Sequence, residues 1–376
     1  MSKSISIVII GGGLAGLTAA IHLTKMGLEV TLIEKNEYPK HKVCGEYISN
    51  EVLPYLDYLG LNIAELQPSY INKLQFSIQD GKQIECPLPL GGFGISRYAL
   101  DYYLYKKAVA NGCTVIQGLV EDIEFNNNSF KIITNASNVL QVDIVLGAYG
   151  KRSIIDQKLH RTFIQKKSPW LAVKAHYTGV FPNDLVGLHN FKGGYCGVSK
   201  VENNQINICY LADYKTFKNF KNIEEYQQAI VINNPHLKQI FAQCQILFDK
   251  PLTISQIAFD KKEAVENHML MIGDTAGLIH PLCGNGMAMA IHSAKIAAEL
   301  VFDYCNDKEQ SRRELETKYK QQWDFHFKKR LKTGRFLAKV LQKQKLAALL
   351  LRIVIILPFI LPKIIKSTHG KPIRIY

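Results

Sequence analysis

Three glycines near the start of the chain have the spacing of a dinucleotide-binding loop. Gly11, Gly13 and Gly16 directly follow the apolar run Ile5–Ile10. In a Gly-x-Gly-x-x-Gly pattern the first glycine permits a tight turn, the second lets the backbone approach a pyrophosphate, and the third allows close helix packing. Glu34 lies eighteen residues after Gly16, where a carboxylate can bind a ribose hydroxyl. The predicted contacts with this ligand are Gly11, Gly13, Ala15, Gly16, Glu34 and Lys35.

A strand, a helix and a second strand must position these residues. The run Ile5–Ile10 has no polar alternation, as expected of a buried parallel strand. The helix predicted after it carries Leu17 and Ile21 on one face and stops at Gly27. Val30–Ile33 is then predicted as the second strand. The alternative is a tight turn between a strand and a helix that binds no ligand.

A second glycine-rich stretch, GDTAGLIHPLCGNGMAMAIHSA, runs from Gly273 to Ala294. A strand that ends in Gly-Asp can place the Asp274 carboxylate on a ribitol or ribose hydroxyl. A helix predicted to begin near Asn285 directs its free N–H groups and its positive end at the same place. For a flavin, this would stabilise negative charge that develops on reduction. The predicted contacts here are Gly273, Asp274, Pro281, Gly284, Gly286 and Met287.

Together these motifs resemble the p-hydroxybenzoate hydroxylase-like flavoproteins. The resemblance also rests on Ser96-Arg97 before a predicted helix and on GAYGKRS at residues 147–153, and it covers about residues 1–330. Within this family, the Cys44-Gly45-Glu46 triplet and the Gly277 that follows GDTA are most similar to the geranylgeranyl reductase branch. The cofactor that the resemblance implies is FAD.

The resemblance also implies a role for individual residues. Glu34 is expected to bind the adenosine ribose, and Asp274 the ribitol. Arg97 is expected near the FAD phosphates or ribitol. Cys44 and Gly45 are expected near the isoalloxazine ring.

Three departures from the family pattern narrow the chemistry. Tyr149-Gly150 stands where the hydroxylases usually carry Asp-Gly, which argues against their usual handling of NAD(P)H. The Tyr-x-Trp-x-Phe-Pro motif of geranylgeranyl reductases is absent, and its nearest counterpart is the stretch that begins at Tyr195. The Trp-x-Trp-x-Ile-Pro signature of flavin halogenases is also absent, since Trp170 and Trp323 stand alone, and this argues against halogenation.

The chain also has no second Gly-x-Gly-x-x-Gly and no Cys-x4-Cys pair. Two-nucleotide disulfide reductases need a separate nicotinamide domain and a dithiol, so this class is disfavoured. If NAD(P)H is the electron donor, we expect it to visit the flavin transiently.

We predict an α/β fold with a Rossmann-type FAD-binding domain, a β-meander, an inserted mainly antiparallel substrate domain and a C-terminal helical tail. The meander is predicted from the alternating runs Val120–Phe125, Phe130–Thr134 and Val139–Val142. The predicted FAD-binding domain comprises residues 1–72, 95–167 and 256–305. The substrate domain comprises 73–94 and 168–255, and the tail comprises 306–376.

Cys44 and His280 are the candidate catalytic residues. Cys44 could be a reactive thiol beside the flavin, or a small residue that fills a loop. His280 could donate a proton or a hydrogen bond, or it could structure its loop. Lys174, His176 and Tyr195 are candidate substrate contacts on the antiparallel sheet. For Lys174 and His176 a solvated sheet face is the favoured alternative.

The net charge of +14 comes from the end of the chain. Between Phe325 and Tyr376 there are thirteen Lys or Arg and no Asp or Glu, which leaves 33 basic and 32 acidic residues elsewhere. The basic part predicts an amphipathic helix, and the apolar run Leu346–Leu361 is shorter than the roughly 20 residues that a spanning helix needs. We expect attachment to an anionic membrane surface. The alternative is a helix packed over the substrate domain. The apolar run argues against a nucleic-acid partner.

The cysteines predict a reducing compartment and no metal site. No Cys-x-x-Cys pair or metal-like spacing occurs, and no signal peptide is expected before the first strand. We therefore expect a cytoplasmic protein, peripheral on the inner face of the membrane if the tail binds lipid. The eight cysteines are Cys44, Cys86, Cys113, Cys196, Cys209, Cys244, Cys283 and Cys305.

The sequence predicts an FAD-dependent oxidoreductase that acts on a hydrophobic, lipid-like substrate. The favoured reaction is that of a monooxygenase, hydroxylation of the aromatic ring of a phenolic lipid. One alternative is saturation of isoprenoid carbon–carbon double bonds. The second alternative, from another class, is a membrane-associated flavin-binding protein without turnover.

Overall fold

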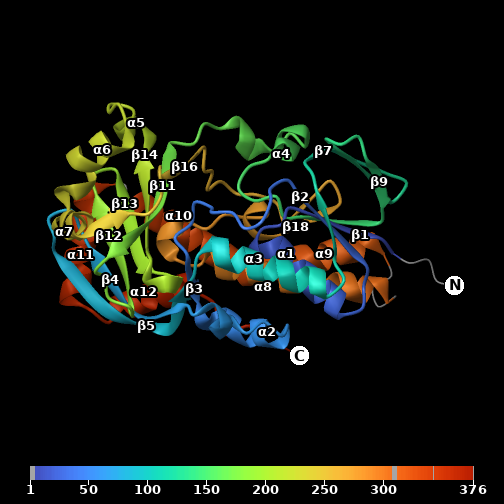
Figure 1. Ribbon diagram of the computed structural model, residues 1–376, viewed down its shortest axis with the longest axis horizontal. Coiled ribbons are helices and arrows are strands. Elements are labelled where there is room, and N and C mark those ends of the chain that lie inside the picture. Colours follow the sequence, from blue (N-terminus) through green and yellow to red (C-terminus); the bar gives the residue numbers. More distant parts are fainter. Residues whose placement is uncertain (1–4, 307–310, 342, 376) are drawn as a thin grey trace.

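The first part of the fold is a mainly parallel sheet (Figure 1). The computed structural model describes residues 5–306, 311–341 and 343–375. The sheet has the order β17-β18-β10-β1-β2-β6, and all neighbours are parallel except β17 and β18. Its strands are β1 (Ile7–Ile10), β2 (Val30–Glu34), β6 (Thr114–Gln117), β10 (Ile144–Gly147), β17 (Val265–Glu266) and β18 (Met269–Met271).

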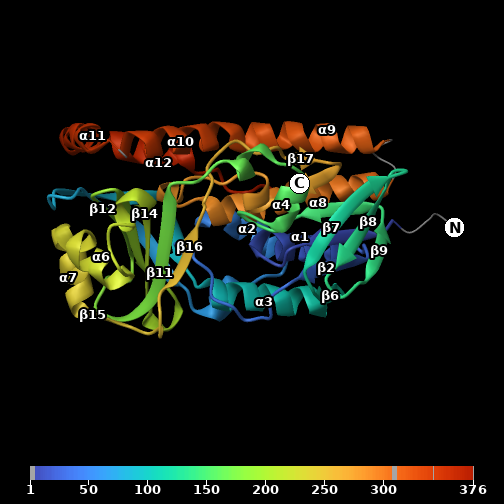
Figure 2. The ribbon, with the colours of Figure 1, turned by 90° about the horizontal axis from the view of Figure 1, so that it is seen from above.

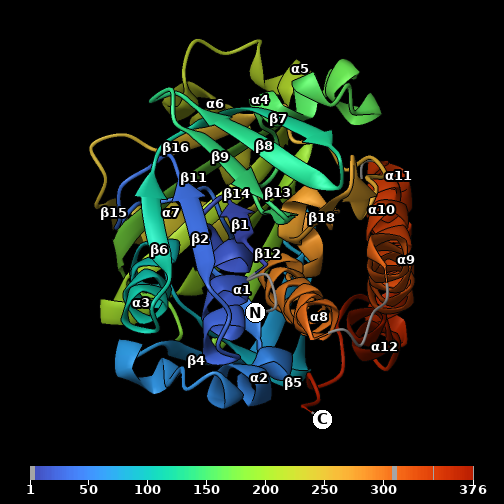
Figure 3. The same cartoon turned by 90° about the vertical axis from the view of Figure 1, so that its right-hand side faces the viewer.

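Three helices lie side by side against this sheet (Figure 3). They are α3 (Arg97–Ala110), α1 (Leu14–Lys25) and α8 (Gly286–Cys305), and α1 contacts both others. Strand β1 is buried along its whole length, which explains its uninterrupted apolar sequence. Ala19 and Ala20 of α1 are fully buried, and their small side chains let the neighbouring elements approach closely.

A small antiparallel meander adjoins the parallel sheet. It consists of β7 (Val120–Asn126), β8 (Ser129–Thr134) and β9 (Val139–Val142). β7 pairs with β8 and β8 with β9. The meander therefore forms as predicted from its alternating residues.

The second part of the fold is a nine-stranded sheet. Its main path is β15-β11-β14-β13-β12-β4-β5-β3, and β16 pairs with β11 beside that path. Neighbours are antiparallel except β12 and β4, which run parallel. Its strands are β3 (Tyr47–Ser49), β4 (Ser69–Ser77), β5 (Gln83–Gly94), β11 (Trp170–Gly179), β12 (Leu185–Phe191), β13 (Gly194–Lys200), β14 (Ile206–Asp213), β15 (Cys244–Ile246) and β16 (Leu252–Ser255).

Short helices cover one face of this large sheet. Tyr226 and Leu237 are fully buried and pack into one core with Val198 and Ile208. The helices that complete this core are α5 (Tyr214–Phe217), α6 (Ile223–Ala229) and α7 (Pro235–Gln243). Two further short helices, α2 (Leu53–Tyr58) and α4 (Ile154–Lys158), lie in connections elsewhere in the chain.

The C-terminal tail is a series of helices along one edge of the molecule (Figure 2). Helices α9 (Arg312–Trp323), α10 (Lys329–Leu341) and α11 (Gln344–Ile356) form one row, with a π-helical stretch at Asp324–Lys328. Helix α12 (Ile360–Thr368) turns back and contacts β5 and α10. Packing against the large sheet, one of the two expected arrangements, is thus observed for α12, and membrane binding stays a prediction.

No single described helix is long and apolar enough to cross a membrane. Among the residues that the structure describes, one helix pair, Ala348–Ile356 and Ile360–Thr368, meets the required length and composition when taken together, and its two helices are bent by 118° relative to each other.

The predicted α/β fold is confirmed, together with its antiparallel second sheet and its helical tail. A short turn at Glu202–Asn204 connects β13 to β14. The large sheet also takes in β3 and the beginning of β4, which lie before residue 73. The domain boundaries given above stay predictions.

Candidate active site

One large cavity extends from the glycine loop to the C-terminal tail, with a volume of about 670 Å³. Its walls come from both sheets and from helices α10, α11 and α12. Four predicted site residues, Gly16, Lys174, His176 and His280, are not among those that line it. The predicted residues that do line it are Gly11, Gly13, Ala15, Glu34, Lys35, Cys44, Gly45, Arg97, Tyr195, Gly273, Asp274, Pro281, Gly284, Gly286 and Met287.

The glycine loop leaves room for a ligand at the start of α1. Gly11 has φ +105°, and a Cβ there would lie 2.4 Å from the carbonyl oxygen of Ala148. A Cβ at Gly16 would lie 2.0 Å from the carbonyl oxygen of Gly11, so only glycine allows this close packing. At Gly13 a Cβ would meet nothing closer than Arg97 Nη2, at 3.6 Å. Gly13 provides no side-chain cap for α1, so the first N–H groups of the helix can bind a pyrophosphate.

The Glu34 carboxylate is held at the end of β2 beside this loop. Oε2 accepts a hydrogen bond from Gly12 N at 2.7 Å, and Oε1 accepts one from Asn36 N at 2.9 Å. Asn36 Nδ2 also donates to Oε1, at 2.6 Å. Each carboxylate oxygen has two lone pairs, so Oε2 keeps one lone pair for a ribose hydroxyl. The geometry fits the role that the sequence assigns to Glu34.

Arg97 is fixed at the same end of the cavity by a buried carboxylate. Its Nε and Nη2 each donate to Asp101 at 2.7 Å, and Lys42 Nζ donates to Asp101 at 2.8 Å. Burial works to raise the pKa of Asp101, but the two cations outweigh it and keep this pKa below its usual range. Asp101 is therefore an ionised anchor that orients the Arg97 guanidinium beside the glycine loop.

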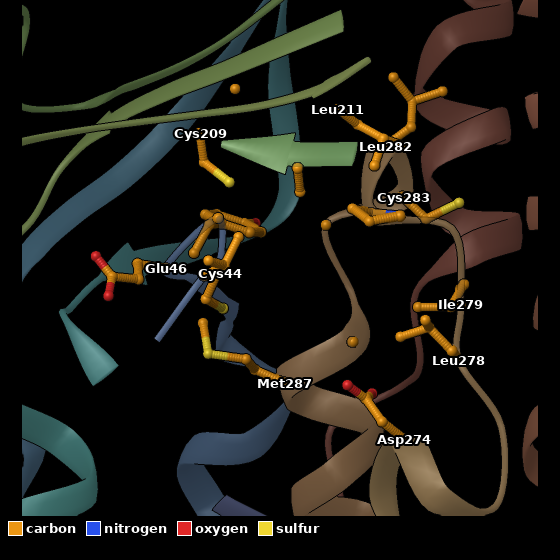
Figure 4. A pocket seen from close by; sticks show the side chains of 18 of the residues that line it. Cys44, Glu46, Cys209, Leu211, Asp274, Leu278, Ile279, Leu282, Cys283 and Met287 are labelled. Atoms are coloured by element: carbon orange, nitrogen blue, oxygen red, sulfur yellow. The ribbon is translucent and has the colours of Figure 1, made fainter. Parts of the chain in front are cut away.

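The Cys44–Gly45 segment is attached to the large sheet by one amide. Asn207 on β14 donates from Nδ2 to the carbonyl oxygens of Cys44 and Gly45, at 3.2 and 2.9 Å. Cys44 lies between Cys209 and Met287 at the cavity wall (Figure 4). Burial, followed by the nearness of Cys44, raises the pKa of the Cys209 thiol to about 12, so this thiol is protonated at neutral pH.

Asp274 and the start of α8 face the same opening (Figure 4). Gly273 has φ +62°, and a Cβ there would lie 2.9 Å from Ala15, so the second glycine-rich loop is pressed against the first. Asn285 precedes α8 and makes no side-chain cap, which leaves the N–H groups at the helix start free for a ligand. Two uncapped helix starts, a glycine cradle and two carboxylates along one cavity fit FAD.

Glu46 forms a buried ion-pair cluster that the sequence analysis missed. Its carboxylate points away from Cys44 and Asp274 (Figure 4). Oε1 lies 3.1 Å from Lys174 Nζ and Oε2 lies 2.6 Å from His176 Nε2, and all three side chains are buried. Arg97 N also donates to Oε1, at 2.9 Å. Burial works to raise the pKa of Glu46, but His176 and Lys174 lower it overall.

This cluster corrects the interpretation of Lys174 and His176. The favoured alternative, a solvated sheet face, is wrong because both side chains are buried. Alternation along β11 predicted correctly that they share a face, but it could not show that Glu46 covers it. The one sequence feature that pointed to this cluster was Glu46 itself, an acidic residue directly after Cys44-Gly45 for which the sequence offered no role.

Tyr195 and His280 meet at one wall, and only Tyr195 reaches the cavity. The His280 ring lies 5.8 Å from Tyr195, 5.9 Å from Trp170 and 4.7 Å from Phe259 between ring centroids. His280 Nδ1 accepts a hydrogen bond from Leu282 N at 3.4 Å. Burial lowers the pKa of His280 to about 4, so the ring is neutral at pH 7. The geometry favours the loop-structuring role of His280 over the catalytic one.

The tail is fastened to the flavin-binding part through Glu51, a second residue that the sequence analysis did not single out. The Glu51 carboxylate accepts hydrogen bonds from Arg330 Nη1 at 3.1 Å, Asn285 Nδ2 at 3.0 Å and Gly370 N at 2.7 Å. Both ends of the α10–α12 segment therefore meet at one buried carboxylate. Asn285 connects this anchor to the start of α8.

Comparisons with known proteins place this chain among oxidoreductase-type enzymes, and the matching family profile is FAD-dependent. A family profile described as FAD dependent oxidoreductase matches residues 6–45, which contain the glycine loop and Glu34. A tryptophan 2-halogenase of Chondromyces crocatus is 23% identical over 80% of this chain, and the match spans 62% of that enzyme, less than two thirds. A digeranylgeranylglycerophospholipid reductase of Thermoplasma volcanium is 24% identical over 79% of this chain and 78% of that enzyme.

A solved flavin-dependent brominase has a similar fold. The two chains superpose with a TM-score of 0.79 at 18% identity, covering 96% of this chain and 92% of the brominase. At this identity the likeness shows the fold alone. The sequence resemblance had pointed to the p-hydroxybenzoate hydroxylase-like class, whereas the similar solved structure is a flavin-dependent halogenase. The expected resemblance to geranylgeranyl reductases is matched by a relative at low identity. The chain is an enzyme of the FAD-dependent oxidoreductase type, and FAD is its cofactor.

Proposed function

We propose that the enzyme acts on a lipid-like substrate whose apolar chain lies in the cavity between Cys44 and the tail. The observation that supports this is the continuity of the cavity: residues that fit FAD line one end, and aliphatic side chains from three distant segments line the other. These aliphatic residues include Leu74, Leu88, Val186, Leu188, Leu350, Val354, Leu361, Ile364 and Ile365. A chamber of this kind favours a long apolar chain over a small polar substrate.

The reaction that we propose is saturation of a carbon–carbon double bond in an isoprenoid chain. The Thermoplasma volcanium relative is named as a reductase of such a lipid. Bound, reduced FAD would supply a hydride to one carbon, and the other carbon then needs a proton. Cys44 and Cys209 line the cavity at the flavin loop, and the protonated Cys209 thiol can hold such a proton. Solvent would restore the proton, and a transient nicotinamide donor would restore the electrons.

Hydroxylation of an aromatic lipid, the reaction favoured by the sequence, is the second candidate. The aromatic wall of Tyr195, backed by Trp170 and Phe259 around His280, favours it because it could stack a phenolic ring. A flavin-binding protein without turnover is set aside, because the halogenase and the reductase that the chain resembles are enzymes.

Anaerobic reoxidation of the flavin separates the two reactions. The purified holoprotein would be reduced with dithionite without oxygen and mixed with a geranylgeranyl lipid. Flavin reoxidation with a saturated product supports the reductase, whereas a product formed only with oxygen supports hydroxylation. Failure of every isoprenoid and phenolic lipid under both conditions would contradict a lipid substrate.

Two cysteine variants give this experiment a matched pair. Cys209→Ser should slow reoxidation, because a hydroxyl is a weaker acid than the thiol that holds the proton in the proposed reaction. Cys305→Ser, at the end of α8 and outside the cavity lining, should react as the unmodified protein does. Equal rates for both variants would remove Cys209 from the mechanism.

A further inference from the structure

The tail helices separate the cavity from the outer surface of the molecule. Leu337 and Val340 of α10, Val354 of α11 and Ile365 of α12 line the cavity. Helix α12 lies between α10 and β5, and α11 continues the outer row (Figure 2). The same short segment therefore presents one face to the cavity and another to the outside.

The outward side of the tail is unusually apolar. Phe325 is 81% exposed, Ile356 is 74% exposed and Phe359 is 58% exposed. A folded protein rarely leaves several large side chains so accessible within one segment unless they bind something. The exposed apolar residues of this tail face are Phe325, Phe336, Leu346, Leu349, Ile353, Ile355, Ile356, Leu357 and Phe359.

Cations are interleaved with these apolar residues. Along the π-helical stretch and α10, the exposed positions Phe325, Lys329, Lys332, Phe336 and Lys339 follow at intervals of four, three, four and three residues. This spacing places them on one side of a helix. No acidic residue occurs from Phe325 to the end of the chain. The tail face thus combines positive charge with accessible aromatic and aliphatic side chains.

The most apolar part of the tail, the bend between α11 and α12, lies at the end of the segment away from its anchor at Glu51. Arg330 and Gly370 are both held by Glu51, so the base of the segment is fixed to the body of the protein. At the far end the chain bends by 118° between α11 and α12, and Ile356 and Phe359 lie at this bend. A fixed base and a projecting apolar tip suit shallow insertion into a lipid layer.

We propose that the tail face binds an anionic lipid bilayer, and that the bilayer delivers the lipid substrate to the cavity behind it; the second statement rests on the proposed function. Cations attract anionic headgroups, and the apolar side chains enter the acyl boundary. A second copy of this chain is a poorer occupant, because two such faces would bring like charges together. The bilayer is also the phase in which a long isoprenoid substrate dissolves.

Vesicle binding of the FAD-loaded full-length protein tests the proposal without any turnover. We expect co-sedimentation with vesicles made of equal parts phosphatidylcholine and phosphatidylglycerol, and weak binding to pure phosphatidylcholine. Binding should decrease with added salt, because the attraction to anionic lipid is screened. Equal binding to both vesicles, or none to either, would overturn the proposal.

Matched variants locate the binding surface. Ile356→Asp should weaken vesicle binding by about tenfold or more, since it removes an inserted apolar side chain and adds a repelled charge. Val180→Asp changes an equally exposed residue, 76% accessible, which directly follows β11 and lies outside the tail, and should bind normally. Lys339→Glu should weaken binding by about fivefold or more, and exposed Lys192→Glu should not.

Two outcomes separate this proposal from the proposed function. If vesicles bind but no lipid reoxidises the flavin, the surface stands and the substrate assignment fails. If detergent-dispersed lipid reacts while vesicles do not bind, the substrate assignment stands and the surface fails. Self-association of the protein that Ile356→Asp abolishes, without vesicle binding, would assign the face to a second copy instead.

Discussion

The two ends of the cavity are built from different materials. At the FAD end, backbone groups of two glycine-rich loops and two helix starts form the wall, and the Glu34 and Arg97 side chains are held there by hydrogen bonds. At the tail end, aliphatic side chains of β12, α10, α11 and α12 form the wall. The FAD end binds its ligand specifically because its backbone wall is rigid. The tail end selects a ligand by its shape and its apolar character.

Gly11→Ala tests whether the FAD end of the cavity is rigid, and it should have the largest effect. The alanine would need a φ of +105° and would press its Cβ to 2.4 Å from a backbone oxygen. We expect a cost of about 4 kcal/mol and a near-complete loss of bound FAD. Flavin released per chain on denaturation measures it. Gly118→Ala is the control, because its Cβ would make only an ordinary contact at 3.5 Å. Full flavin content in Gly11→Ala would refute the rigid-cradle interpretation.

Glu46→Gln should lower the free energy of unfolding by about 3 kcal/mol, because Lys174 would be left buried without its counter-ion. Urea unfolding measures the loss. Asp184→Asn removes the exposed partner of Lys73 and should leave the free energy of unfolding unchanged within error. Similar losses for both variants would argue against a buried cluster.

The Glu46 cluster should also make the stability depend on pH. Since the pKa of Glu46 is lowered from 4.5, the unmodified protein should lose the stabilisation by Glu46 as the pH falls below 4.5.

His280 should make the stability depend on pH at mildly acidic values. Its pKa falls from 6.5 in the unfolded chain to about 4 in the folded protein, so the unfolded chain takes up the proton first. Stability should therefore decline as the pH falls from about 6.5 to 4, by about 2 kcal/mol at pH 5. His280→Asn retains an acceptor for Leu282 N and should flatten this part of the unfolding profile. An unchanged slope would show that His280 is not buried as described.

The smallest effect is expected at the tail end. Leu188→Trp fills part of the apolar chamber and should slow flavin reoxidation by a long isoprenoid lipid about tenfold. The flavin content should change little, because Leu188 belongs to β12 and is not part of either glycine-rich loop. Reoxidation by a shorter isoprenoid measured alongside provides the control. Equal slowing of both lipids would point to damage at the flavin rather than in the chamber.

The sequence was a good guide to the FAD end because the required residues are local. Gly11, Gly13 and Glu34 occur within one strand–helix–strand unit, and backbone geometry dictates their types. The clusters around Glu46 and Glu51 could not be predicted, since their partners Lys174 and Arg330 lie 128 and 279 residues away. The sequence also did not show that the tail lines the cavity. An apolar side chain has the same sequence signature whether it faces lipid, a hydrophobic core or a cavity.

The pairing of β12 with β4 has a consequence for folding. β4 and β5 lie between β2 and β6 in the chain, yet β4 pairs in parallel with β12, more than a hundred residues later. The large sheet can therefore close only after the chain has passed through the parallel sheet and returned. Such non-local pairing slows folding and couples the two sheets. We expect a single cooperative unfolding transition, and we expect residues 168–255 made alone, without their β4 edge, to fail to fold.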